Sequence, residues 1–229
     1  MTPISAVPIP PSPGQLSRRD LRGLTSRIEK RVLIAIAKRL PPWIGPDHLT
    51  ALGVLALGGA GLCYKLLAVS PLALLGVNAF LFLNWFGDSL DGTLARVREK
   101  QRPRYGFYLD HLVDAIGAIF LLGGLSVSGL ASPPAAAALL IAYLLLQIHI
   151  ALKAHATGVF QIAFGGVGGT EARLLLAAAN LVLMLKPDLV AFATNVVWGL
   201  VIALIGVVLK DGVKTGRALD REERLGWIE

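Results

Sequence analysis

The chain has 229 residues, enough for one compact unit or one modest helical bundle. Hydrophobic residues make up 55% of it, and charged residues make up 16%, whereas soluble domains have about 25% charged residues. The apolar residues come in long runs, which excludes an ordinary soluble domain and indicates a membrane protein. In so apolar a chain the positive-inside rule and anionic lipid headgroups explain the net charge of +7 better than nucleic acid does, and the single cysteine, Cys63, excludes an intrachain disulfide framework.

The amino-terminal region predicts a tail followed by a surface helix. Residues 1–16 are rich in proline and serine without an apolar core, so we expect a disordered tail and no secretory signal. Across residues 17–40, apolar side chains recur at helical spacing among basic ones, at Leu21, Leu24, Ile28, Val32 and Ile36. This pattern predicts an amphipathic juxtamembrane helix lying on the membrane surface, with a basic soluble linker as the alternative.

Six apolar segments follow, and prolines separate several of them. They run approximately over residues 49–69, 72–95, 106–130, 134–156, 171–186 and 189–209. A helix of about 20 residues crosses the roughly 30 Å hydrocarbon core, and the fifth segment is short for this task. The sequence therefore predicts an all-α integral membrane protein, with a domain of six transmembrane helices over residues 41–210 and a cytoplasmic tail over residues 211–229.

Basic residues fall almost entirely on one side of this predicted bundle. Of the 22 lysines and arginines, only Lys65 and Lys186 lie on the other side. The positive-inside rule therefore places both termini in the cytoplasm, which an even number of spans requires. We expect a multi-pass protein of a bacterial-type cytoplasmic (inner) membrane.

Four aspartates occur where the second and third spans approach the cytoplasmic face: Asp88, Asp91, Asp110 and Asp114. A carboxylate near the middle of a membrane costs about 2.5–3.5 kcal/mol on insertion scales, so these groups need compensating positive charge. Asp88 and Asp91 share one broad helix face, and Asp110 and Asp114 are spaced i, i+4. Since Asp88 and Asp114 each lie about 12–14 Å along antiparallel helices from their cytoplasmic ends, we expect the four carboxylates to meet at one depth.

Four carboxylates without a matching internal cluster of lysine and arginine suit hard divalent cations. Two ions would leave the site nearly neutral, and two ions about 3.5–4 Å apart are the usual clamp for displacement at phosphorus. Small side chains at Gly92, Ala95 and Gly106 would let a pyrophosphate approach the helix backbone, and Arg96 could reach a phosphate oxygen. The alternatives are a buried polar network, an ion- or proton-coupled transporter that uses these aspartates, and a noncatalytic membrane scaffold.

The order of these residues resembles the signature of the CDP-alcohol phosphotransferase family. It reads Asp88-x2-Asp91-Gly92-x2-Ala95-Arg96-x9-Gly106-x3-Asp110-x3-Asp114. Residues 46–50 are also similar to the entry to the family's first span, with Asp47 where the family has asparagine. The resemblance covers roughly residues 41–210, and its diagnostic part is residues 88–114.

This resemblance implies a six-helix bundle, usually a homodimer, with a polar cavity that faces the cytoplasm. It implies Mg²⁺ or Mn²⁺ on Asp88, Asp91 and Asp110, while Asp114 shares in metal binding or serves as the catalytic base. The implied reaction is attack of an acceptor hydroxyl on the β-phosphorus of a CDP-alcohol, which makes a phospholipid and releases CMP.

The acceptor site and the substrates stay open on the sequence alone. Lys153 and Arg173 flank the connection between the fourth and fifth spans and are candidates for binding an acidic acceptor. Residues 168–171 resemble a Gly-Pro-Thr-Glu stretch of choline and ethanolamine phosphotransferases, with Gly169 in the place of proline, so Glu171 is a further candidate. That stretch favours CDP-choline or CDP-ethanolamine with diacylglycerol, whereas the compact chain favours CDP-diacylglycerol with a small polar alcohol. In both cases one substrate is a lipid.

Overall fold

The computed structural model describes residues 26–158 and 168–226, and every regular element in these ranges is helical. The α-helices of these ranges are α1 (Ser26–Arg39), α2 (Pro46–Lys65), α3 (Ala73–Val97), α4 (Pro103–Ser126), α5 (Pro133–Thr157), α6 (Gly169–Leu185) and α7 (Val190–Gly226). Two short 3₁₀ turns, η1 (Leu66–Ala68) and η2 (Pro187–Leu189), follow α2 and precede α7. The predicted all-α class is confirmed for the described part of the chain.

Five of the described helical segments are long and apolar enough to cross a membrane: α2 with η1, α3, α4, α5, and η2 with α7. Their length and composition make the chain a multi-pass membrane protein. Helix α6 has 17 residues and is not among the five, so the predicted count of six spans stays a prediction. The predicted tail over residues 1–16 lies outside the described residues, as does the first part of the predicted helix over residues 17–40.

Proline and glycine set several helix ends. Pro46, Pro103 and Pro133 stand at the start of α2, α4 and α5, where the missing backbone N–H would have had no helical partner. Gly158 ends α5 in the left-handed conformation, with a φ of 69°. The sixth predicted span stops at residue 209, but α7 continues unbroken to Gly226 over 37 residues. Such a helix is about 55 Å long, well beyond the roughly 30 Å hydrocarbon core.

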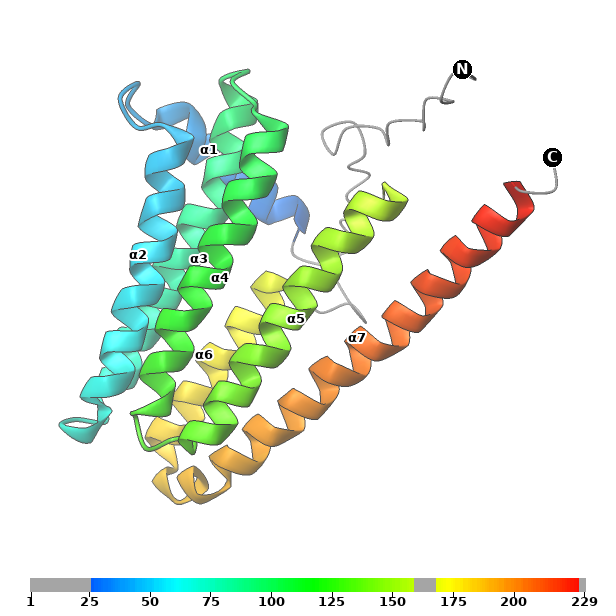
Figure 1. Ribbon diagram of the computed structural model, residues 1–229. Helices are drawn as coiled ribbons and strands as arrows, with labels where there is room; N and C mark the ends of the chain where they lie inside the picture. Colours follow the sequence, from blue (N-terminus) through cyan, green and yellow to red (C-terminus); the bar gives the residue numbers. More distant parts are fainter. Residues whose placement is uncertain (1–25, 159–167, 227–229) are drawn as a thin grey trace.

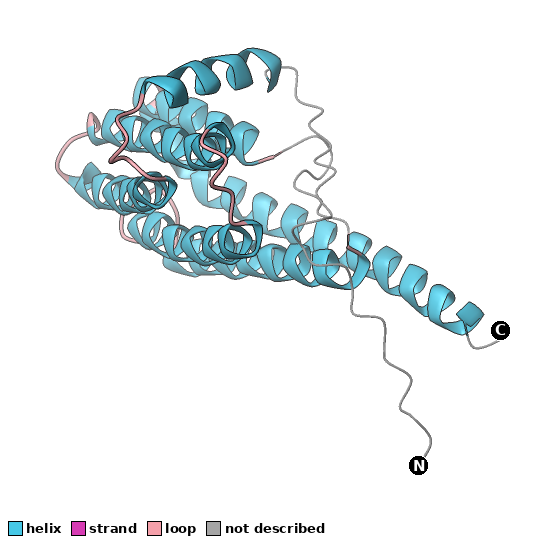
Figure 2. Ribbon diagram, turned by 90° about the horizontal axis from the view of Figure 1, so that it is seen from above, coloured by secondary structure: helices cyan, strands magenta, loops and turns pink. Residues whose placement is uncertain are grey.

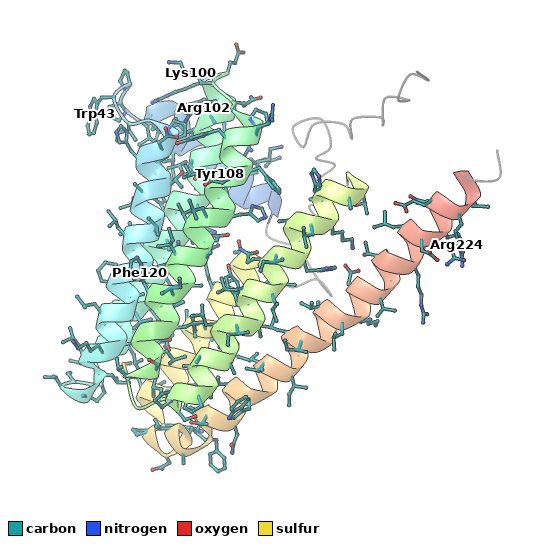
Figure 3. All side chains as sticks on the ribbon, viewed as in Figure 1. Trp43, Lys100, Arg102, Tyr108, Phe120 and Arg224 are labelled. Atoms are coloured by element: carbon teal, nitrogen blue, oxygen red, sulfur yellow. The ribbon has the colours of Figure 1, made fainter. Side chains whose placement is uncertain are left out.

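The helices from α2 to α7 alternate in direction, so that α1 and the carboxyl-terminal end of α7 lie at the same end of the bundle (Figure 1). Lys100 and Arg102, in the connection between α3 and α4, also lie at this end, and Arg224 lies far out on α7 (Figure 3). The hydrogen bond with Asp47 raises the pKa of the Arg102 guanidinium and ties the connection to the start of α2. Because α6 packs on α3 and runs antiparallel to it, it brings the start of α7 to the opposite end.

Small residues allow α2 to approach both α3 and α4 closely, which is a common basis of helix packing in membranes. A Cβ atom on Gly124 of α4 would lie 2.1 Å from the carbonyl oxygen of Gly61 in α2. Similarly, a Cβ atom on Gly87 of α3 would lie 2.6 Å from the carbonyl oxygen of Leu49. The backbone of α2 thus fixes how α3 and α4, the helices with the four aspartates, are placed.

A buried polar network at the other end of the bundle joins α6 to this unit. The Tyr64 hydroxyl of α2 donates to Oδ1 of Asn180 at 3.0 Å, and Nδ2 of Asn180 donates to Oδ1 of Asn78 in α3 at 2.8 Å. Asn180 is only 1% exposed, so each of these hydrogen bonds satisfies a group that water does not reach. This network holds α6 against α3.

Helix α1 crosses the other helices at one end of the bundle (Figure 2). Its Leu33 and Ala37 are buried against Leu90 of α3 and neighbouring apolar residues. Val32 belongs to the predicted apolar stripe but is 49% exposed, so the face that packs on protein lies one residue further along. Arg98 fixes the connection that follows α1, because its guanidinium donates to several backbone carbonyls there, including that of Leu40 at 3.1 Å.

Candidate active site

The four aspartates lie in the halves of α3 and α4 that meet at the connection between them. They line one small cavity, whose walls include Thr50, Gly53, Asn84, Asp88, Asp91, Asp110 and Asp114. The cavity has a volume of about 10 Å³, close to the room that one water molecule needs. The structure therefore brings the carboxylates of both helices to one place.

Asp91 is the most enclosed of the four, at 9% exposed. Its Oδ2 accepts a hydrogen bond from the hydroxyl of Thr50 on α2 at 2.6 Å, and its Oδ1 accepts one from the backbone N–H of Gly92. Thr50 is itself buried where α2 packs on α3. The close packing of α2 thus supplies a donor that fixes the Asp91 carboxylate.

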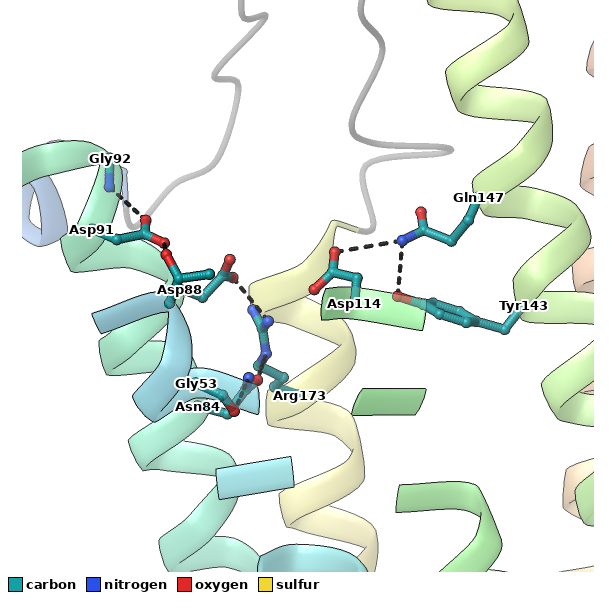
Figure 4. A network of polar contacts seen from close by, with 10 residues as sticks. Gly53, Asn84, Asp88, Asp91, Gly92, Asp114, Tyr143, Gln147 and Arg173 are labelled. Atoms are coloured by element: carbon teal, nitrogen blue, oxygen red, sulfur yellow. Dashed lines mark hydrogen bonds and ion pairs between the residues drawn. The ribbon is translucent and has the colours of Figure 1, made fainter. Parts of the chain in front are cut away.

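Asp88 is more open, with 41% of its side chain exposed, and is paired with Arg173 of α6. Nη2 of Arg173 lies 2.8 Å from Oδ2 of Asp88, and Nε of Arg173 donates to Oδ1 of Asn84 at 2.7 Å. Asn84 in turn donates to the carbonyl of Gly53 at 3.0 Å (Figure 4). A continuous chain of polar contacts therefore links α2, α3 and α6 beside the cavity.

Asp114 faces α5 on the other side. Nε2 of Gln147 lies 3.4 Å from Oδ2 of Asp114 and 3.2 Å from the hydroxyl of Tyr143, so Gln147 connects the two (Figure 4). The longer contact is at the weak end of hydrogen-bond distances. Asp114 is therefore oriented without being tightly held.

Asp110 lies one turn before Asp114, exposed at the open side of the cavity that it helps to line. Nothing lies within 4 Å of where a Cβ atom on Gly106 would stand, so open space flanks the start of α4. Arg96 donates to Thr93 at 3.0 Å and lies over Gly92, where a Cβ atom would meet its Nη1 at 3.4 Å. The structure thus groups Gly92, the half-buried Ala95 and Arg96 at the end of α3, next to the aspartates.

The three candidates for acceptor binding do not lie in one cluster. Arg173 contacts Asp88, as described above, whereas Lys153 on α5 donates to Oδ2 of Asp211 on α7 at 2.6 Å. His149, one turn from Lys153, contacts the same oxygen at 2.8 Å. Glu171 accepts a hydrogen bond from the backbone N–H of Gly168 at 3.0 Å and so stabilises the first turn of α6.

Sequence reasoning missed the polar partners that surround the aspartates. Asn84 and Gln147 each interrupt an apolar run, and Asn84 stands one helical turn before Asp88, which was an available signal. Asp211 falls in the predicted tail over residues 211–229, but Lys153 and His149, which share a face of α5, both contact it. Thr50 belongs to the family-like entry over residues 46–50, but nothing in that pattern indicates its hydrogen bond with Asp91.

The donor set suits a hard divalent cation, because carboxylate oxygens are the ligands that Mg²⁺ and Mn²⁺ prefer. In the described part of the chain, no three Asp, Glu, His or Cys side chains are close enough together to hold one ion in the arrangement shown. The aspartates fit a metal site in their chemistry and in their convergence on one cavity. To hold an ion they would have to draw closer, and Asp88 would have to leave Arg173.

Comparison with known families identifies the relatives of this chain. Residues 43–209 match the CDP-alcohol phosphatidyltransferase family, a range that includes all four aspartates and most of the bundle. No curated protein sequence matches the chain. Since the family match covers well over half of the sequence, the chain belongs to the CDP-alcohol phosphatidyltransferase family.

Proposed function

We propose that this protein is a metal-dependent enzyme that transfers a phospho-alcohol group from a CDP-alcohol to an acceptor hydroxyl and releases CMP. The observation that carries the proposal is the convergence of four aspartates on one cavity, in a chain that matches the family over residues 43–209. The family match does not favour the alternative of an ion- or proton-coupled transporter. Nor does a noncatalytic scaffold explain four carboxylates in two apolar helices.

In this proposal Asp88, Asp91 and Asp110, with a contribution from Asp114, hold two Mg²⁺ or Mn²⁺ ions. When bound, such ions would neutralise the negative charge on the pyrophosphate of the donor and on the departing CMP. Thr50 keeps the Asp91 carboxylate in one orientation through its hydrogen bond at 2.6 Å. Groups that orient ligating carboxylates by a hydrogen bond commonly contribute to metal affinity as well.

Asp114 is the proposed general base. It takes the proton from the acceptor hydroxyl as the hydroxyl oxygen forms a bond to the β-phosphorus and the bond from that phosphorus to the bridging oxygen of CMP breaks. Its contact with Gln147 is long, so the carboxylate keeps an oxygen available for the proton. The open space beside Gly106, together with Gly92 and Ala95, would admit the pyrophosphate, and Arg96 at the end of α3 would bind a phosphate oxygen.

The proposed substrates are one lipid and one polar molecule. CDP-diacylglycerol with a small polar alcohol, or CDP-choline or CDP-ethanolamine with diacylglycerol, both satisfy this description. Arg173, Lys153 and Glu171 remain the candidates for acceptor binding, although each is engaged by another protein group in the arrangement described. An acceptor that uses Arg173 or Lys153 would have to compete with Asp88 or Asp211.

The proposed topology has six spans, with α6 as the fifth. Helix α6 is about 26 Å long at the usual rise, slightly short of a roughly 30 Å core, and its antiparallel course against α3 supports a crossing. Both termini and the active site then face the cytoplasm of a bacterial-type inner membrane, and the protein works as a homodimer. The domain limits follow: a tail over 1–16, a surface helix over 17–40, the catalytic bundle over 41–210 and a tail over 211–229.

The test uses the full-length protein in lipid nanodiscs with Mg²⁺ and Mn²⁺. One set of reactions supplies CDP-diacylglycerol with glycerol phosphate, inositol, inositol phosphate or serine, and the other supplies CDP-choline or CDP-ethanolamine with diacylglycerol. We expect a new lipid by mass spectrometry, with an equal amount of CMP, in one of the two sets. The absence of both products from every reaction would contradict the proposed function.

A further inference from the structure

Arg173 is a cationic side chain in direct contact with Asp88, one of the aspartates that line the cavity. Its Nη2 lies 2.8 Å from Oδ2 of Asp88, and its side chain is only 20% exposed. Asp88 is 41% exposed, so water screens the pair in part, but less than it screens a pair in which both side chains lie on the surface. The contact therefore offsets part of the mutual repulsion among the carboxylates.

A second contact holds Arg173 independently of Asp88. Nε donates to Oδ1 of Asn84 at 2.7 Å, and Asn84, at 3% exposed, is fixed in turn by the carbonyl of Gly53. Nε and Nη2 are different donors of one guanidinium group. The Nη2 contact with Asp88 can therefore break while the Nε contact with Asn84 is kept.

We propose that Arg173 acts as an internal counter-ion that competes with the divalent cation for Asp88. This inference rests on the metal site of the proposed function, and it makes Arg173 a positioning residue that sets metal affinity. A cation that takes Asp88 releases the Nη groups, which leaves an uncompensated positive charge beside the cavity. Because that charge favours an anionic ligand, binding of the cation and binding of a nucleotide phosphate strengthen each other.

The test is Mn²⁺ binding to the purified full-length protein, measured by calorimetry with and without CMP. Without CMP, we expect Arg173→Gln to bind Mn²⁺ about tenfold more tightly than the original protein, since the charged group that competes for Asp88 has been removed. A tenfold change in the dissociation constant corresponds to about 1.4 kcal/mol of binding free energy. We expect Arg173→Lys, which keeps the charge but lacks the paired N–H groups, to lie between the two. CMP should tighten Mn²⁺ binding several-fold in the original protein and less in Arg173→Gln.

The matched control is Arg102→Gln, which breaks the ion pair with Asp47 at the surface, where both side chains are about half exposed. It should leave the Mn²⁺ dissociation constant unchanged. If Arg102→Gln bound Mn²⁺ as much more tightly as Arg173→Gln does, the loss of one positive charge anywhere on the protein would explain the effect, and the inference would be overturned. Equal or weaker Mn²⁺ binding by a folded Arg173→Gln would also overturn it while leaving the proposed metal site intact. If Arg173→Gln does not fold, Arg173→Lys decides by the same comparison. A lack of Mn²⁺ binding by the original protein would overturn the metal site and this inference together.

Discussion

Gly123 and Gly124 are adjacent in α4, yet the structure gives them opposite roles. A Cβ atom on Gly124 would lie 2.1 Å from the carbonyl oxygen of Gly61 in α2, whereas nothing lies within 4 Å of a Cβ atom on Gly123. Alanine at position 124 must therefore push two helix backbones apart. Overpacking of this kind costs about 1–3 kcal/mol.

The two alanine variants form a matched pair. Each gains about 1 kcal/mol of helix propensity over glycine, and this gain cancels in the difference between them. We expect Gly124→Ala to be less stable than Gly123→Ala by about 1–3 kcal/mol, and Gly123→Ala to be at least as stable as the original protein. At about 2–4 °C per kcal/mol for a chain of 150–250 residues, the difference in Tm amounts to several degrees.

The assay is thermal unfolding of each variant in the same detergent, followed by tryptophan fluorescence, with gel filtration to check that both enter the transition folded. Since α2 also packs on α3, separating it from α4 should displace Asp110 and Asp114 from the other two aspartates, so CMP release should fall in Gly124→Ala alone. Equal Tm values for the two variants would refute the close crossing of α2 and α4.

Three other predictions concern the site and the topology. Thr50→Val keeps the shape but removes the donor to Asp91, so we expect Mn²⁺ affinity and turnover to fall about 10–100-fold, and an unchanged affinity would contradict the role of that hydrogen bond. Asp114→Asn should lower the rate of CMP release about 10²–10⁴-fold and leave CMP binding in Mg²⁺, measured by calorimetry, nearly intact, whereas Asp91→Asn should weaken both. If Asp114→Asn instead bound CMP far more weakly than Asp91→Asn and turned over normally, the two roles would be exchanged. Single cysteines at Lys100 and Thr215, in a chain lacking the native cysteine, should be labelled only from the cytoplasmic side, and labelling of either from outside would overturn the six-span topology.

The spacing of the aspartates could be read from the sequence because it depends on a single helix at a time. Residues at i and i+4 share a face, and two antiparallel helices joined by a short connection bring their faces to one depth. The partners of those aspartates could not be read in this way. Thr50, Arg173 and Gln147 reach them from α2, α6 and α5. Such contacts depend on how helices are rotated against each other, which spacing within one helix does not determine.

The ends of the bundle show a similar limit. The sequence places the end of the last span at residue 209, because hydropathy falls where Lys210 begins a charged stretch, but a helix can leave the membrane without ending, and α7 continues to Gly226. In α1 apolar residues stand on more than one face, so the pattern could not tell that Leu33, rather than Val32, packs against α3. Gly123 and Gly124 are likewise equivalent in the sequence and become distinct only once α2 lies against α4.

The central claim is that the four aspartates support a metal-dependent transfer from a CDP-alcohol. The most direct measurement is CMP release by the purified protein with its preferred substrates, first in EDTA and then after addition of excess Mg²⁺ or Mn²⁺. We predict that release stops in EDTA and returns with either ion, because four carboxylates in an apolar bundle need divalent charge to bind a pyrophosphate. Undiminished CMP release in EDTA would contradict the claim.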